Sequence, residues 1–183
     1  MPKPHLVKQK VKMKFPARSV IVSAAVIKGR IRMWDYVDGR WNGNAAAAMY
    51  GGPLAKALKK AFPGEAAKAR PRFCVLEDND PTGYKSGKAL QAKECAGIRT
   101  DDLPHRSPDL NVLDYSLWHE IEIRMRLQEQ HFPKNYKESA ESYKQRLRRV
   151  AMSLPPRVVR KAVRDMKRRT AAVWKEKGGL ISE

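Results

Sequence analysis

Residues 107–118 read SPDLNVLDYSLW, and this stretch places a carboxylate at the start of a helix. Its apolar positions recur at helical spacing, at Leu113, Leu117 and Ile121. Asp114 therefore falls in the first turn of the expected helix. Upstream, the apolar run in FCVLEDND (73–80) predicts a buried strand that ends at Asp78. Carboxylates from two such segments could meet at one edge of a sheet, where a pair of acids can hold a catalytic metal ion.

Composition narrows the class of protein. The chain has 183 residues, of which 42% are hydrophobic, so it is long and apolar enough to form one domain with a core. Its formal charge of +19, from 38 basic and 19 acidic residues, indicates a polyanionic partner, and nucleic acid is the foremost candidate. No segment has the roughly 20 apolar residues of a membrane-spanning helix, and the first residues form no signal peptide, so we expect no membrane partner and no secretion. Cys74 and Cys95 have neither disulfide nor zinc-site spacing, which favours the nucleus or another intracellular compartment.

The order of elements predicts an α/β domain in which strands come early and helices late. Residues 19–27 and 30–37 are two β-rich runs joined by Lys28-Gly29, so they predict an antiparallel hairpin. With the strand at 73–78 and a short one within 98–103, they predict one sheet of antiparallel and parallel strands covered by helices. Six helices are expected, at about 44–50, 53–62, 83–97, 111–130, 139–154 and 155–177.

Three smaller features complete the expected organisation. Residues 1–16 are expected to form an edge strand or an extended basic arm, because apolar residues alternate there with Lys8, Lys10, Lys12 and Lys14. Gly51-Gly52 is expected to separate the first two helices. All four tryptophans are expected to be core anchors: Trp34, Trp41, Trp118 and Trp174.

SPDLNVLDYSLW resembles the SPDLNPxE signature of mariner-type transposases, in which the acid is the third member of a catalytic Asp-Asp-Asp/Glu triad. By that match the third acid is Asp114. DNDPTGY (78–84) is similar to the family's DNAPCH motif and puts the second acid at Asp78. The interval from position 78 to position 114 agrees with the family to within about a residue. The segments VIVSAAVIKG (20–29) and KEKGGLI (175–181) also resemble family segments, so the similarity covers nearly the whole chain.

The resemblance implies a fold, a reaction and a cofactor. The implied fold is a ribonuclease H-like mixed sheet flanked by helices, here a partial transposase or integrase catalytic domain over residues 17–183. The implied reaction is metal-dependent phosphodiester hydrolysis and strand transfer on DNA, by a transposase that acts as an endonuclease. The implied cofactor is Mg²⁺ or Mn²⁺, two ions in the family, and the matching ligands are Asp78 and Asp114. A homodimer is implied where the domain is part of the full-length enzyme.

Three departures from the family pattern change the expected activity. Val112 stands where the family has Pro, and Thr82-Gly83-Tyr84 replaces its Cys-His ending. No Asp or Glu precedes Ser19, although the family carries its first acid on an opening strand before the hairpin. Two ions roughly 4 Å apart need a bridging carboxylate. We therefore expect a domain without its first strand, in which DNA cleavage is weak or absent.

Each acid also has a structural explanation. Asp114 could cap the helix start together with Asn111. Asp78 could simply form a turn at the end of a strand, as Asp-Asn pairs commonly do. The paired motif favours metal binding for both residues.

The last helix carries a regular basic stripe. Its residues recur at spacings of four, three and four, at Arg157, Lys161, Arg164 and Arg168. A solvated helix face is one explanation, and contact with DNA phosphates, together with the lysines of residues 1–16, is the other. A second class of function therefore stays open, a basic nucleic-acid-binding protein without catalysis. Its DNA binding would be indifferent to metal ions.

Overall fold

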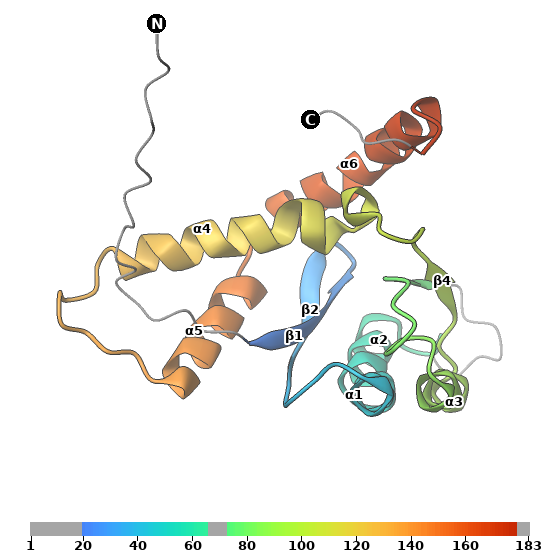
Figure 1. Ribbon diagram of the computed structural model, residues 1–183, viewed down its shortest axis with the longest axis horizontal. Coiled ribbons are helices and arrows are strands. Elements are labelled where there is room, and N and C mark those ends of the chain that lie inside the picture. Colours follow the sequence, from blue (N-terminus) through green and yellow to red (C-terminus); the bar gives the residue numbers. More distant parts are fainter. Residues whose placement is uncertain (1–19, 66–72, 179–183) are drawn as a thin grey trace, which may run out of the picture.

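The computed structural model describes residues 20–65 and 73–178, and they form two small sheets surrounded by helices (Figure 1). The strands are β1 (Ile21–Ile27), β2 (Arg30–Val37), β3 (Val75–Glu77) and β4 (Thr100–Asp102). β1 pairs with β2 antiparallel, and β3 pairs with β4 parallel. The expected hairpin and both short strands are thus confirmed, but within the described residues they make two separate two-stranded sheets instead of one. The basic segment of residues 1–16 lies outside the described ranges.

The helical elements follow the expected order. They are α1 (Gly43–Met49), η1 (Tyr50–Leu54), α2 (Ala55–Ala61), α3 (Gly87–Ala96), η2 (Pro108–Leu110), η3 (Leu113–Leu117), α4 (Trp118–Glu129), α5 (Ala140–Met152) and α6 (Pro156–Lys175). Figure 1 shows the hairpin between two helical groups, with α4 and α5 to one side and α1, α2 and α3 to the other. Among the described residues, no helix combines the length and apolar character needed to cross a membrane.

The two residues of the hairpin turn, Lys28 and Gly29, adopt the backbone conformation that a tight β-hairpin requires. Lys28 and Gly29 both have positive φ, of 51° and 69°, which is the backbone pattern of the two-residue turns that match the twist of paired strands. Gly29 also meets a neighbour, because a Cβ built there would come within 2.5 Å of Cγ of Arg160 on α6. The turn is therefore packed closely against the side chain of the last helix.

An irregular register lets β2 serve two cores. The pairing steps from Ala25–Met33 to Val26–Ile31, so Arg32 is an extra residue in β2. Ile31 joins the core cluster formed with α4, α5 and α6, whereas Met33 joins the cluster formed with α1, η1, α2 and α3. Two residues that an unbroken strand would place on one face thus reach opposite faces.

The glycine pair does not end the first helix, contrary to expectation. The backbone continues through η1 as a wider π turn that contains Gly51, Gly52 and Pro53. Tyr50 and Leu54, at the two ends of this turn, are 0% and 2% exposed and pack in the core. Tertiary packing therefore outweighs the low helix propensity of glycine and proline.

The buried face of α6 differs from the expected one. Val163 was expected on it but is 42% exposed, and the buried residues are Val159, Ala162 and Arg169. The guanidinium of Arg169 lies 4.2 Å from the ring centroid of Tyr115, so a cation–π contact lets the helix bury an arginine. Trp174, near the end of α6, is 87% exposed and is no core anchor.

Candidate metal and nucleic-acid site

The two acids singled out by the sequence interact electrostatically in the structure. Asp78 directly follows β3, and Asp114 lies on η3. Burial raises the pKa of Asp114, and the negative charge of Asp78 raises it further, so the two carboxylates lie within electrostatic reach of each other. Tyr84 lies within electrostatic reach of both acids. Burial raises the pKa of its phenol, and the charges of nearby acids, Asp78 and Asp114 among them, raise it further.

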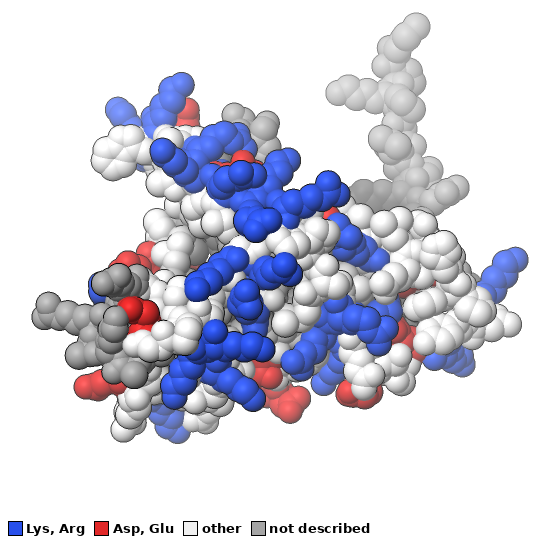
Figure 2. All heavy atoms as spheres, turned by 180° about the vertical axis from the view of Figure 1, so that it is seen from behind, with Lys and Arg blue, Asp and Glu red and all other residues white. Residues whose placement is uncertain are grey.

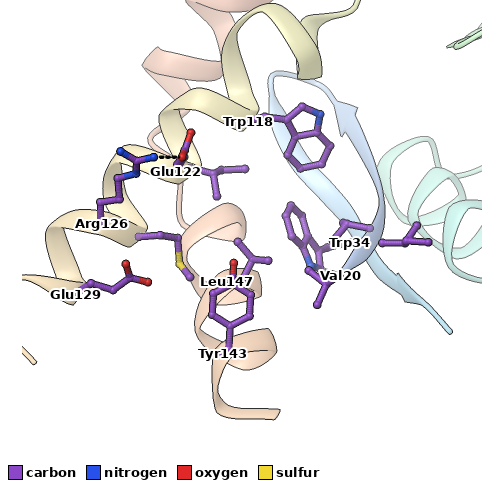
Figure 3. A pocket seen from close by; sticks show the side chains of 12 residues that line it. Val20, Trp34, Trp118, Glu122, Arg126, Glu129, Tyr143 and Leu147 are labelled. Carbon is purple, nitrogen blue, oxygen red and sulfur yellow. Dashed lines mark hydrogen bonds and ion pairs between the residues drawn. The ribbon is translucent and has the colours of Figure 1, made fainter. Parts of the chain in front are cut away.

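Trp118 orients the Asp114 carboxylate. Its indole Nε1 donates a hydrogen bond to Asp114 Oδ1 at 3.1 Å, across one helical turn. Trp118 is itself held edge-on against Trp34 of β2, with ring centroids 5.7 Å apart. Figure 3 shows both rings at one end of a hollow of about 610 Å³ between the hairpin and helices α4 and α5. A packed aromatic pair thus fixes the side chain that holds the acid.

The capping explanation of Asp114 is met only in part, because its carboxylate has a side-chain hydrogen bond with Asn111 but none with the backbone N–H of that residue. Asn111 Oδ1 accepts from the backbone N–H of Leu113 at 3.1 Å, so the asparagine does stabilise the helix start. The backbone N–H of Asn111, however, donates to the carbonyl of Pro108. The reciprocal bond that defines a capping box is therefore replaced by the bond from Trp118.

Asp80, rather than Asp78, forms the turn after β3. Its carboxylate accepts from Gly83 N at 2.9 Å, from Thr82 N at 3.2 Å and from Trp41 Nε1 at 3.0 Å. Burial would raise the pKa of Asp80, but these hydrogen bonds together hold it below its usual range. Glycine is required at position 83, because a Cβ there would come within 2.1 Å of the Trp41 ring. The departure from the family motif at 82–84 thus has a structural role here.

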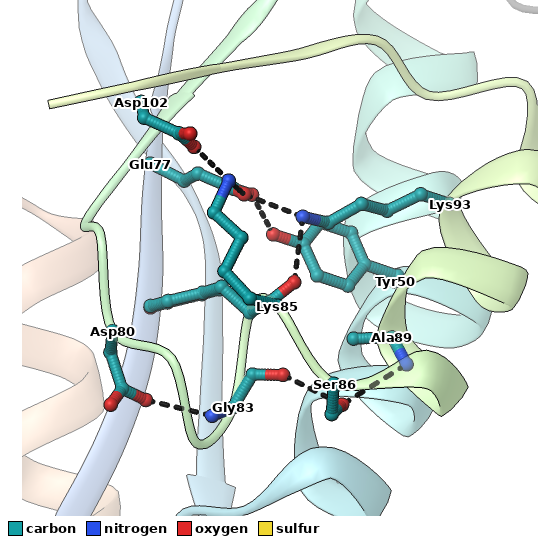
Figure 4. A network of polar contacts seen from close by, with 10 residues as sticks. Tyr50, Glu77, Asp80, Gly83, Lys85, Ser86, Ala89, Lys93 and Asp102 are labelled. Carbon is teal, nitrogen blue, oxygen red and sulfur yellow. Dashed lines mark hydrogen bonds and ion pairs between the residues drawn. The ribbon is translucent and has the colours of Figure 1, made fainter.

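A buried polar network anchors β3 beside the site (Figure 4). Lys93 Nζ of α3 lies 2.5 Å from Glu77 Oε1 and also donates to the Tyr84 carbonyl at 2.9 Å. The hydroxyl of Tyr50 donates to Glu77, and Lys85 lies 3.5 Å from it. Glu77 is 5% exposed and fully engaged, so it is not free to supplement a metal site.

The basic stripe is solvent-exposed and adjoins the element that bears Asp114. All four of its residues are exposed on α6: Arg157, Lys161, Arg164 and Arg168. The hydroxyl of Tyr115, the residue after Asp114, donates to the carbonyl of Ala162, which packs α6 against η3. Figure 2 shows Lys and Arg side chains gathered over the projecting helix and across the neighbouring face. The lysines at 8, 10, 12 and 14 lie outside the described residues.

The chain is similar in fold to solved structures of a transposase and of its catalytic domain. The Mos1 mariner transposase catalytic domain superposes with a TM-score of 0.67 at 19% identity, over 89% of this chain and 76% of that one. The same domain bound to raltegravir and Mn gives a TM-score of 0.67 at 18% identity, over 89% and 78%. The chain has the fold of a mariner transposase catalytic domain.

That fold confirms the expected ribonuclease H-like α/β architecture. A Mos1 transposase paired-end complex with a left transposon end matches over all of this chain and 52% of its own, with a TM-score of 0.65 at 18% identity. No family model and no curated protein sequence matches the chain. The similarity to mariner transposases therefore consists of the shared fold and of the motif resemblance around Asp78 and Asp114.

The donor set within this transposase fold suits one hard cation. Carboxylate oxygens are the ligands that Mg²⁺ and Mn²⁺ prefer, and Mg²⁺ is often bound by one or two carboxylates with water and phosphate. Among the described residues, no group of three His, Cys, Asp or Glu side chains could hold a metal ion. Asp78 and Asp114 therefore fit a single ion, whereas the described residues do not complete a two-ion site.

Sequence reasoning missed the residues that support the acids. The bond from Trp118 could have been found, because the two residues are four apart on a helix. The interaction of Tyr84 with the charge of Asp114 and the Trp41–Asp80 hydrogen bond connect segments that are distant in sequence, and no local pattern indicates them.

Proposed function

We propose that the chain is a transposase-type domain that binds DNA and one Mg²⁺ or Mn²⁺, and that cleaves DNA weakly or not at all. The observation that carries this proposal is the electrostatic interaction between Asp78, just after β3, and Asp114 on η3, within a fold shared with Mos1. Solved Mos1 structures include one with Mn, one with Mg and a strand transfer complex, and these support a divalent metal ion and DNA as the binding partners proposed here.

The protein's own residues have separate tasks in this proposal. Asp78 and Asp114 bind the ion, Trp118 holds the Asp114 carboxylate in place, and the α6 stripe binds phosphates. A bound ion would polarise a phosphoryl oxygen and make water a better nucleophile. Weak cleavage follows because two acids leave the second ion of the usual pair without a bridging ligand.

A Mn²⁺ titration tests the metal site. Paramagnetic Mn²⁺ held at Asp114 is expected to quench the fluorescence of Trp118, measured in a Trp174→Phe background that removes the exposed indole. Asp78→Asn and Asp114→Asn should each weaken the apparent affinity by about tenfold or more. Asp38→Asn, which changes an exposed acid elsewhere, is the matched control. Equal affinities for all three variants would contradict the site.

Salt-dependent DNA binding tests the stripe. Arg164→Gln or Arg168→Gln should weaken binding to any DNA sequence and reduce the slope of log affinity against log salt by about 1. Lys60→Gln, an exposed lysine on α2, is the control and should leave the slope unchanged. A stripe variant that binds like wild type would exclude α6 from the interface.

Two outcomes concern catalysis. Efficient Mn²⁺-dependent DNA cleavage that is lost in Asp114→Asn would show that the weak-activity proposal is wrong. DNA binding that is unaffected by Mn²⁺, in a protein that shows no quenching, would instead favour the second candidate, a non-catalytic basic nucleic-acid-binding protein. The charge of +19 is the observation that supports that candidate.

Location and assembly follow from the same proposal. We propose an intracellular, nuclear site of action, because the partner is DNA. A homodimer is proposed only for a full-length enzyme of which this domain is part. Fluorescence microscopy of a tagged chain and light scattering on DNA would test these two statements.

A further inference from the structure

Trp174 stands near the end of α6 with its side chain in solvent. It is 87% exposed, more than any other large hydrophobic residue of the described ranges. Figure 1 shows this end of α6 extending beyond the neighbouring elements. A single exposed apolar residue needs no explanation by itself, so the surroundings of the indole decide whether it has a role.

The residues one turn before Trp174 leave space beside its ring. A long side chain on a helix leans toward the N-terminus and lies over the preceding turn, which here holds Thr170 and Ala171. Both residues are small. The Thr170 hydroxyl donates to the carbonyl of Met166 at 2.9 Å, so it is turned onto the helix backbone. A flat ligand can therefore lie against the indole.

Basic residues flank the indole along α6. Lys167 precedes Trp174 by seven residues, which places it on the same face about 10.5 Å away along the axis. Lys175 follows the indole directly, and Arg164 and Arg168 of the stripe lie on the adjoining face. All four of these basic residues are exposed, and Figure 2 shows Lys and Arg side chains gathered over this helix. An aromatic ring among cations matches a ligand that combines bases with phosphates.

Two other partners for an exposed tryptophan fit α6 less well. A membrane surface takes up an amphipathic helix by its apolar face, but that face of α6 is packed in the core through Val159 and Ala162. A second copy of the chain would bring an equally basic helix against this one, and like charges repel. Nucleic acid supplies both negative charge and flat rings.

The exposed indole can distinguish unpaired DNA from paired DNA. In a duplex the bases are stacked on one another, so a side chain reaches only their edges in the grooves. Unpaired bases offer their faces, and their stacking on an aromatic side chain tolerates any sequence. Phosphate contacts are open to the stripe with either form of DNA. The contribution of Trp174 would therefore be confined to unpaired bases.

We infer that the end of α6 is a binding site for single-stranded DNA, in which Trp174 stacks on an unpaired base while Lys167 and the stripe bind the flanking phosphates. This inference rests on the DNA binding proposed above and names the form of DNA that this part of the surface selects. It does not depend on the metal site.

Titrations of the intact chain without metal test the site. The labelled ligands are a strand of about 12 thymidines, a duplex of the same length, and an abasic strand that keeps the phosphates but has no bases. Fluorescence anisotropy gives their affinities. Trp174→Leu should weaken binding of the thymidine strand about tenfold and leave binding of the duplex and of the abasic strand unchanged. The thymidine strand should also quench the part of the fluorescence that Trp174→Phe removes.

Matched variants separate stacking from charge and from apolar bulk. Trp174→Phe keeps a flat ring and should retain most of the affinity that Trp174→Leu loses. Leu127→Ala, which shortens a 52% exposed side chain on α4, should have no effect. Arg168→Gln should weaken binding of the thymidine strand and of the duplex and reduce the salt slope by about 1, whereas Trp174→Leu should leave the slope unchanged.

Each contrary result has its own meaning. The inference is overturned if Trp174→Leu binds the thymidine strand like wild type, if it weakens duplex binding equally, or if Trp174→Phe is as weak as Trp174→Leu. Tighter binding of a uridine strand would overturn DNA as the ligand. Where duplex binding persists in these cases, the proposed function stands and only this site is removed. Absence of binding to both duplex and strand would contradict the two proposals together.

Discussion

Glu77 and Asp78 are adjacent acids with opposite surroundings. Glu77 is 5% exposed and is bound by Lys93, Lys85 and the Tyr50 hydroxyl, whereas Asp78 is exposed just beyond the strand and adds repulsion to Asp114. A carboxylate that is neutralised inside the protein contributes to a unique fold, and one that faces another acid stores repulsion that a cation can relieve. Adjacency in sequence therefore says little about the role of an acid. The partners that each one meets decide it.

The largest expected effect comes from removing the partner of Glu77. Lys93→Met leaves a buried carboxylate with weaker compensation and should lower the free energy of unfolding by about 3 kcal/mol, measured by urea denaturation. Lys88→Met, at an exposed position of the same helix, should cost well under about 1 kcal/mol. Equal losses would mean that the Glu77 network is not a stabilising element. The double variant Glu77→Leu, Lys93→Met should recover much of the loss, because no charge stays buried.

A smaller effect is expected at Asp80, which shapes the chain after Asp78. Asp80→Ala removes the hydrogen bonds from Gly83 and Trp41 and should cost about 1–2 kcal/mol at pH 7. Because the pKa of Asp80 is lowered on folding, its stabilisation is present above the ordinary pKa of aspartate and is lost as the pH falls through the lowered value. The gap between wild type and variant in urea denaturation should therefore close below about pH 4. A gap that is constant from pH 7 to pH 3 would contradict this assignment, and Asp38→Ala serves as the control.

The smallest effect has the opposite sign and concerns Asp114. Its pKa is raised by burial and by Asp78, so the ionised carboxylate opposes folding above that pKa. Asp114→Asn should raise Tm at pH 7 by no more than about 1 °C, because water screens the charge of this exposed side chain and the asparagine oxygen can still accept from Trp118. The gain should vanish at acid pH, where wild-type Asp114 is protonated in both states. A drop in Tm at pH 7 would indicate that the carboxylate is held in a stabilising contact instead.

Local chemistry made much of the fold predictable. The hairpin follows from two β-rich runs around Lys28-Gly29, and the helix starting near Pro156 follows from its apolar repeat. The continuous helix through Gly51 was not predictable, because the packing of Tyr50 and Leu54 in the core outweighs local propensity. The buried face of α6 was mistaken for a similar reason. Arg169 is buried by contact with Tyr115, a partner that no periodic pattern shows.

Some residues of the candidate site could likewise be predicted from the sequence, and others could not. Asp78 and Asp114 could be singled out because each lies in a distinctive local motif, and in the structure the charge of Asp78 acts on Asp114. The pairing of Glu77 with Lys93 and of Trp41 with Asp80 depends on contacts between separate elements, so it could be read only from the fold. The proposed role as metal ligands stays a prediction until Mn²⁺ binding is measured.

The close fit of Gly29 against Arg160 has a consequence for mutational tolerance. Position 29 is restricted twice, by a backbone conformation that favours glycine and by the arginine stem that fills the place of a side chain. Asn, which tolerates the left-handed conformation better than most residues, would relieve only the first restriction. In a deep mutational scan, substitutions at position 29 should become milder when residue 160 is shortened to Ala. Such a rescue would show that the residues tolerated at position 29 of the hairpin turn depend on the side chain at position 160 of α6.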